Sequence, residues 1–250
     1  MPARLLLSTR VGLALVSVGV AAVAGCSTAD RTAESHEPGT SPRAAPVEKP
    51  LSEQTLQTLV LQSADLPEAR PGAISVQPRA DPADVPSFKP ASDPDCQTVQ
   101  DIRNATTAPA VVDQVINWSN SLFTGSVTLA SYQDGEAARL FTDLKRAVGS
   151  CGAYRGDTWG GAYGSTMKAE KALVAGDEAV QFREHITMDI VAEDGKGTEV
   201  METEALFIVV RTGSVIATYS SLEAGPTANA VFPTEPIIKQ AGRLRAAQNR

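Results

Sequence analysis

Residues 200–220 read VMETEALFIVVRTGSVIATYS, and this stretch decides how the chain must fold. An apolar run, 205–210, and a second strand-like segment, 215–220, flank Thr212-Gly213, a pair typical of the tight turn between antiparallel strands. Every position of 205–210 is apolar, so that strand needs cover on both of its faces. The hairpin therefore predicts a central strand with another layer on each side.

A two-residue turn at Thr212-Gly213 also predicts the register of this hairpin. Val210 would then face Val215, and Ile208 would face Ala217. The two strands would thus share an apolar surface that a helix can cover.

The segments around the hairpin supply more strands and two helices. Apolar and polar residues alternate over 180–190, which indicates a half-buried strand, and 126–132 is typical of a shorter one. Residues 134–149, with Asp134 as a candidate N-cap, and residues 236–247 each carry an apolar stripe at helical spacing. We expect an α+β fold, a mainly antiparallel sheet flanked by helices on both faces.

The first part of the same domain is less regular. Ser52 can cap a helix that carries Leu56, Leu59, Val60 and Leu61 at helical spacing and is stopped by Asp65-Leu66-Pro67. The seven prolines of 67–94 favour irregular or edge structure there. A short helix is expected after Cys96, and a further segment covers 110–118.

The N-terminus has the pattern of an exported bacterial lipoprotein. Arg4 and Arg10 precede an apolar stretch, 11–24. This stretch is too short to span a bilayer as a permanent helix. Val-Ala-Gly at 23–25 followed by Cys26 resembles a lipobox, in which the cysteine thiol is lipidated and becomes the mature N-terminus. The alternative is an uncleaved anchor with a chance cysteine.

Three regions follow from this pattern: a signal peptide at 1–25, a disordered tether at 26–50 and one domain at 51–250. The tether is rich in Pro, Ser, Thr, Ala and charge and has no aromatic residue, so it cannot bury enough apolar surface to fold. We expect an extracytoplasmic protein, attached by its lipid to the outer face of the cell membrane.

The charge balance limits the possible partners. The chain has 22 Lys and Arg against 29 Asp and Glu, and loss of Arg4 and Arg10 with the signal leaves 20 against 29. Such an acidic chain lacks the basic surface that nucleic acids and anionic head groups require. Contact with the membrane would therefore come from the acyl chains on Cys26.

Two cysteines remain for the domain, Cys96 and Cys151. In an oxidising compartment their default state is a disulfide. Metal binding is the other possibility, but two distant cysteines with only His36 and His185 in the chain do not make a zinc pattern. No cofactor or metal is expected.

Several of these features occur together in one known group of proteins. The order of lipobox, tether, SADLP at 63–67 and SVTLASYQDGEAARLFTDLKRAVGSC at 126–151 resembles actinobacterial lipoproteins with a domain like the extracellular sensor domain of PknH-type serine/threonine kinases. The resemblance covers roughly 51–247 and implies a helix-flanked antiparallel sheet with a ligand-binding cleft. The chain departs from that family in lacking a second cysteine pair, a Trp shortly before Cys151 and a kinase domain.

Three residues are candidates for ligand binding: Trp159, Tyr163 and Glu184. The first two lie in a glycine-rich aromatic stretch, 149–164, which would form either a cleft rim or a loop folded back onto the sheet. Glu184 shares a strand face with Phe182 and Ile186, so its carboxylate points toward the core or a cleft. It would be either ion-paired or in contact with a ligand.

The alternative function is that of a cell-envelope serine hydrolase. Ser165-Thr166-Met167-Lys168 matches the S-x-x-K of penicillin-interacting enzymes, and Arg211-Thr212-Gly213 could replace K-T-G. No S-x-N triplet lies between them, and the second motif falls in a turn. We therefore expect a non-catalytic, sensor-like domain that binds a small molecule, lipid, glycan or protein, with no catalytic residues.

Overall fold

The computed structural model describes residues 49–80, 87–133, 135–158, 160–191, 196–225 and 228–250. The expected signal peptide, the lipidation site Cys26 and nearly all of the tether lie outside these residues, as do Asp134 and Trp159. Within the described part, no helix is long and apolar enough to cross a membrane.

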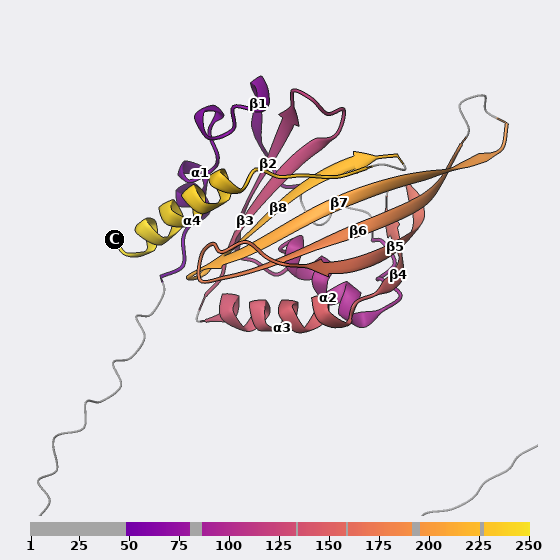
Figure 1. Cartoon of the computed structure of the whole chain (residues 1–250). Helices are drawn as coiled ribbons and strands as arrows, with labels where there is room; N and C mark the ends of the chain where they lie inside the picture. The colour runs from indigo at the N-terminus through magenta and orange to yellow at the C-terminus, as the bar shows by residue number, and fades with distance from the viewer. Residues whose placement is uncertain (1–48, 81–86, 134, 159, 192–195, 226–227) are drawn as a thin grey trace, which may run out of the picture. The chain divides into compact units, whose positions relative to one another are not determined.

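The described strands form one open antiparallel sheet (Figure 1). Its spatial order is β1-β2-β3-β8-β7-β6-β5-β4, so β8 and β7 occupy the centre. The bounds are β1 (Ala69–Gln77), β2 (Ala110–Trp118), β3 (Thr124–Ser131), β4 (Ala153–Thr158), β5 (Gly161–Glu170), β6 (Glu178–Val191), β7 (Thr198–Thr212) and β8 (Val215–Ala224).

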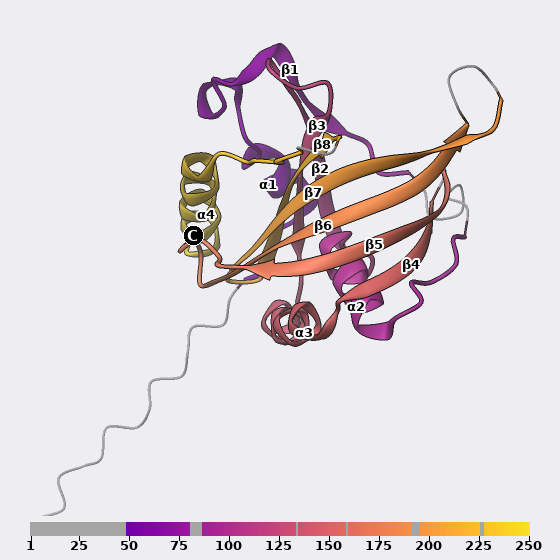
Figure 2. The same cartoon turned by 45° about the vertical axis from the view of Figure 1, so that its right-hand side comes forward.

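Four α-helices cover this sheet, two on each face (Figures 1 and 2). One face packs against α1 (Glu53–Thr58) and α4 (Thr234–Gln248), and a short 3-10 helix, η1 (Ser63–Asp65), follows α1. The other face, here the α2/α3 face, packs against α2 (Pro94–Arg103) and α3 (Glu136–Ser150). The predicted α+β class, with an antiparallel sheet flanked by helices on both faces, is confirmed.

The central strand β7 shows why both layers are needed. Ile208 and Val210 belong to the core beneath α1 and α4, whereas Val209 belongs to the core beneath α2 and α3. All three side chains are at most 2% exposed. A strand that is apolar on both faces is thus buried on both, as its sequence predicts.

The turn of the central hairpin lies one residue later than predicted. Gly213 and Ser214 form the loop, Thr212 pairs with Val215, and Val210 faces Ala217 instead of Val215. Gly213 has φ +60°, and glycine at the first loop position is the preference of a type II′ turn. Each residue pairs with a partner two positions away from the predicted one. Since side chains alternate between faces with a period of two, each side chain keeps its predicted face.

The expectation of a loop over the glycine-rich stretch is wrong. Most of these residues form the β4–β5 hairpin, in which Gly156 pairs with Tyr163. A Cβ atom at Gly156 would lie 2.4 Å from the Tyr163 ring, so the glycine makes room for an aromatic side chain across the ladder. The glycines therefore reflect packing between strands.

The N-terminal elements follow their local sequence signals. Ser52 caps α1, its Oγ accepting from the Thr55 amide at 3.2 Å, but the helix ends at Thr58 and is shorter than predicted. The proline-rich region supplies β1, an edge strand, as expected. Asp93 caps α2 by accepting from the Asp95 and Cys96 amides.

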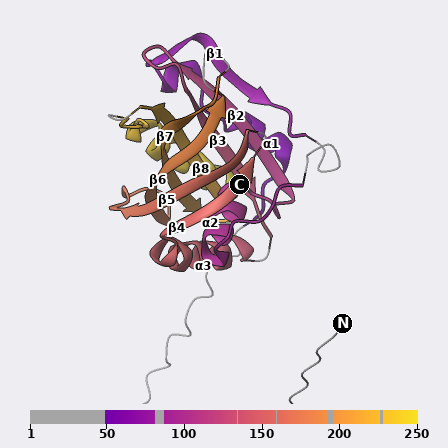
Figure 3. The ribbon, with the colours of Figure 1, turned by 90° about the vertical axis from the view of Figure 1, so that its right-hand side faces the viewer.

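One end of the sheet extends beyond its helices. In Figures 1 and 2, β6 and β7 continue well past α2 and α3, and Figure 3 shows α2 and α3 side by side beneath β4 and β5. Part of the α2/α3 face on β5 to β8 is therefore without helical cover, and the candidate site lies there.

Candidate functional site

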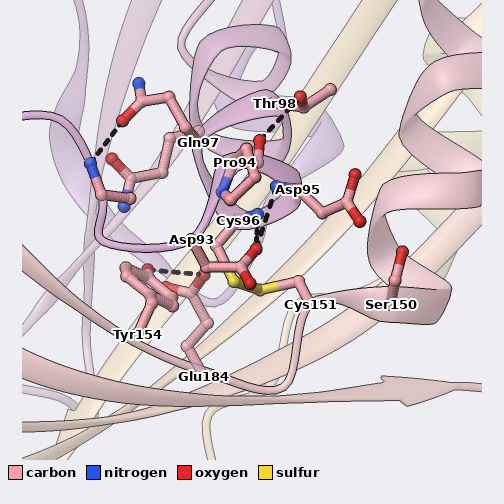
Figure 4. The surroundings of a disulfide bond; sticks show 12 residues. Asp93, Pro94, Asp95, Cys96, Gln97, Thr98, Ser150, Cys151, Tyr154 and Glu184 are labelled. Carbon is pink, nitrogen blue, oxygen red and sulfur yellow. Dashed lines mark hydrogen bonds between the residues drawn. A yellow bond between two sulfur atoms is a disulfide. The ribbon is translucent and has the colours of Figure 1, made fainter. Parts of the chain in front are cut away.

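The predicted disulfide is present. Cys96 in the first turn of α2 and Cys151 just after α3 are bonded, with an S–S distance of 2.10 Å and a Cα–Cα distance of 4.9 Å (Figure 4). Both cysteines are buried. The bond fixes the start of α2 to the end of α3.

A buried ion pair attaches the other end of α2 to the sheet. The Arg103 Nη1 atom lies 2.7 Å from Glu184 Oε1, and the hydroxyl of Tyr154 donates to the same oxygen at 3.1 Å (Figure 4 shows the Tyr154–Glu184 contact). The Arg103 side chain is 11% exposed and the Glu184 side chain 0%. Glu184 is therefore ion-paired within the domain, as one of the two sequence alternatives proposed.

The local structure explains why these two side chains meet. Cys96, Val99 and Arg103 are three and four residues apart on α2, so they share the helix face that turns toward the sheet. Side chains alternate between the two faces of β6, and Glu184 points to the α2/α3 face, the same face on which α2 packs. The Phe207 ring lies 4.2 Å from the guanidinium carbon of Arg103 and adds a cation–π contact.

The site's electrostatics keep Arg103 charged and Tyr154 neutral. Burial, the largest single effect, would lower the pKa of Arg103. The charge of Glu184, its hydrogen bond with Arg103 and the nearby Tyr154 and Tyr163 hydroxyls together outweigh burial and raise that pKa. Burial, followed by the Glu184 charge, raises the pKa of the Tyr154 hydroxyl. Tyr154 thus serves as a hydrogen-bond donor to the pair.

A pocket of about 810 Å³ opens beside this ion pair. Its floor consists of partly buried apolar side chains from neighbouring strands: Tyr163 of β5, Ile186 and Met188 of β6, Met201 of β7 and Leu222 of β8. Tyr163 pairs with Met188, and Met188 with Met201, so the floor is continuous across the sheet. Phe88 and Phe123 also line it.

Helix α2 provides the polar wall of this pocket through Gln100, Asp101, Arg103 and Asn104. The Gln100 amide donates to the Tyr163 hydroxyl at 3.0 Å, which joins the wall to the floor. Arg103 makes no further hydrogen bond or ion pair with a described residue beyond Glu184. A guanidinium has five N–H donors, so Arg103 can still donate into the pocket.

The structure places the candidate ligand residues at different depths. Tyr163 lines the pocket, but from a strand rather than from the expected loop. Glu184 does not line it and instead lies behind Arg103, where one carboxylate oxygen, Oε2, is buried without a hydrogen-bond partner among the described residues. Trp159 is outside the described residues.

The S-x-x-K motif falls within β5, on which side chains alternate between faces. Ser165 is buried on the α2/α3 face, whereas Lys168 is exposed and belongs to the opposite face. Their side chains are therefore not brought together. His185 is exposed on that opposite face as well.

Sequence reasoning missed Arg103, the residue that connects the ion pair to the pocket. A signal was present: Arg103 is four residues after Val99 and seven after Cys96, so it continues the apolar stripe of its helix. A charged residue at a buried position needs a partner of opposite charge, and Glu184 was a core-facing carboxylate for which the sequence named no partner.

No protein-family model matches the sequence, and no curated protein matches it either.

Proposed function

We propose that this chain is a cell-envelope lipoprotein, anchored through Cys26, whose domain binds a small molecule without catalysing a reaction. The pocket on the α2/α3 face carries this proposal. It combines a continuous apolar floor with a few polar groups on one wall, the usual composition of a ligand site. Its volume of about 810 Å³ lies within the range of small-molecule pockets.

The arrangement of α2 supports a preformed site. This helix is tied to α3 by the disulfide at its start and to β6 by the Arg103–Glu184 pair at its end. A wall that is fixed at both ends loses little conformational freedom when a ligand binds, and preorganisation of this kind favours affinity.

The pocket is tested by filling it. M201W places a large ring on the floor and is expected to weaken binding of the uncharged fluorescent probe N-phenyl-1-naphthylamine about tenfold, equivalent to about 1.4 kcal/mol. The matched control is V200W, because Val200 is the neighbouring residue on the opposite face and is 62% exposed. Probe fluorescence is titrated for all three proteins, and equal affinities in both variants would contradict the proposal.

The anchor is tested separately in the full chain. C26S is expected to abolish lipidation, so that the protein is released or accumulates as the precursor, which mass spectrometry of membrane and supernatant fractions detects. Finding the unsubstituted protein in the supernatant, cleaved before an unmodified Cys26, would contradict lipid anchoring. The serine-hydrolase alternative predicts covalent labelling of Ser165 by a β-lactam, which our proposal does not.

A further inference from the structure

The charges around the pocket restrict the ligands it can hold. Among the described residues, four that are charged line it: Lys89, Asp101, Arg103 and Asp157. Glu184 lies directly behind Arg103 and already balances its charge at 2.7 Å. The five side chains together are more acidic than basic, so an anionic ligand would bring negative charge into a site that does not compensate it.

A cationic ligand is opposed by a different feature. Arg103 lines the pocket with a side chain that is 11% exposed, and its guanidinium carries N–H donors only. An ammonium head group is also a donor only, so it could not accept from Arg103 and would leave a buried N–H donor unpaired. Both charge signs are thus disfavoured, and an uncharged ligand fits best.

The polar groups of the wall indicate the kind of uncharged head group. Arg103 and the Asn104 amide offer N–H donors, and the carboxylate of Asp101 offers acceptors on the same helix. A hydroxyl group both donates and accepts, so neighbouring hydroxyls can satisfy both kinds of partner. An ester or ether oxygen alone could use only the donors.

The floor indicates the other half of the ligand. Ile186, Met188, Met201 and Leu222 are partly buried without a helix over them. Methionine is flexible and adapts to irregular apolar shapes, which suits an alkyl chain. Met188 is four residues from Glu184 along β6, so this apolar surface extends roughly 13 Å from the row of the ion pair.

Building on the proposed binding function, we propose that the ligand is an uncharged amphiphile. Its polyhydroxyl head, of the glycerol or sugar type, contacts Arg103, Asn104 and Asp101, and its single alkyl chain lies over Met188 and Met201. The acidic wall excludes fatty acids, and buried Arg103 excludes alkylamines.

Four ligands with the same twelve-carbon chain test this inference: monolauroylglycerol, dodecyl maltoside, lauric acid and dodecylamine. Each is titrated below its micelle concentration, and displacement of N-phenyl-1-naphthylamine from the full domain is measured. At least one uncharged ligand is expected to bind about tenfold more tightly than either charged one. The first two compounds distinguish an acylglycerol from a glycolipid.

A charge variant tests the cause of this selectivity. D101N removes one negative charge from the wall and is expected to raise the affinity for lauric acid about threefold. The matched control is D143N, since Asp143 pairs with Arg139 on α3 and does not line the pocket. An unchanged affinity for lauric acid in D101N would contradict the charge argument.

The remaining outcomes separate this inference from the binding function. The inference would be overturned if lauric acid or dodecylamine bound as tightly as the uncharged ligands. It would also be overturned if none of the four ligands displaced the probe although M201W still weakened probe binding. A probe affinity that M201W leaves unchanged would instead overturn the pocket itself.

Discussion

R103M is expected to lower the free energy of unfolding by about 3–5 kcal/mol, because it leaves the buried carboxylate of Glu184 without a countercharge. Methionine keeps much of the apolar stem of Arg103 and its contact with Phe207, so the loss measures mainly the missing charge. Glu184 is 0% exposed and cannot recover the lost partner from water. Urea unfolding at neutral pH gives the value.

A second substitution at the other partner is the control for this prediction. In the R103M/E184Q double variant the amide needs no countercharge, and its oxygen can still accept from the Tyr154 hydroxyl. We expect the double variant to recover part of the stability lost in R103M.

Two results would contradict this account of the ion pair. A loss below about 1 kcal/mol in R103M would mean that the pair behaves like a solvent-exposed one. A double variant less stable than R103M would mean that the charge of Glu184 has another compensating partner.

Much of the fold could be predicted because its signals are local. The alternation over 180–190, the helical stripe before Cys151 and the doubly apolar run at 205–210 each correspond to an element of the structure. Such periodicities reflect which side of an element is buried. The turn was misplaced by one residue, although Gly213-Ser214 matches the type II′ preference for glycine at the first loop position and Thr212-Gly213 does not.

The β4–β5 hairpin was missed because its reason is not local. Glycine is normally unfavourable in strands, so Gly156, Gly161 and Gly164 predict a loop. In the structure Gly156 lies opposite the Tyr163 ring, which a side chain at that position would displace. A cross-strand requirement of this kind becomes visible only when the pairing is known.

The candidate site shows the same limit. The face of Glu184 follows from strand alternation, and the sequence raised ion pairing as one of two alternatives. The identity of its partner does not follow, because Arg103 lies 81 positions earlier on a helix that packs across the sheet. The pocket also combines floor residues from four strands, β5 to β8, with a wall from α2, which precedes all four in the chain.

The disulfide is the second large contribution to stability, and the C96A/C151A double variant is expected to lose about 2–4 kcal/mol. The bond closes a loop with a sequence separation of 55, and constraint of the unfolded chain accounts for a stabilisation of this size. Reduction by dithiothreitol should lower the unsubstituted protein to about the same stability. The double variant should not respond to dithiothreitol.

The same variant also tests whether the disulfide positions the pocket wall. Without it, α2 keeps its Asp93 cap and the Arg103–Glu184 pair but loses the bond that fixes its first turn to α3. We therefore expect weaker binding of N-phenyl-1-naphthylamine under conditions where the variant is still folded. If the disulfide and the Arg103–Glu184 pair hold the same helix, adding R103M to this variant should lower the free energy of unfolding by more than the sum of the two separate losses. A strictly additive result would show that the two attachments act independently.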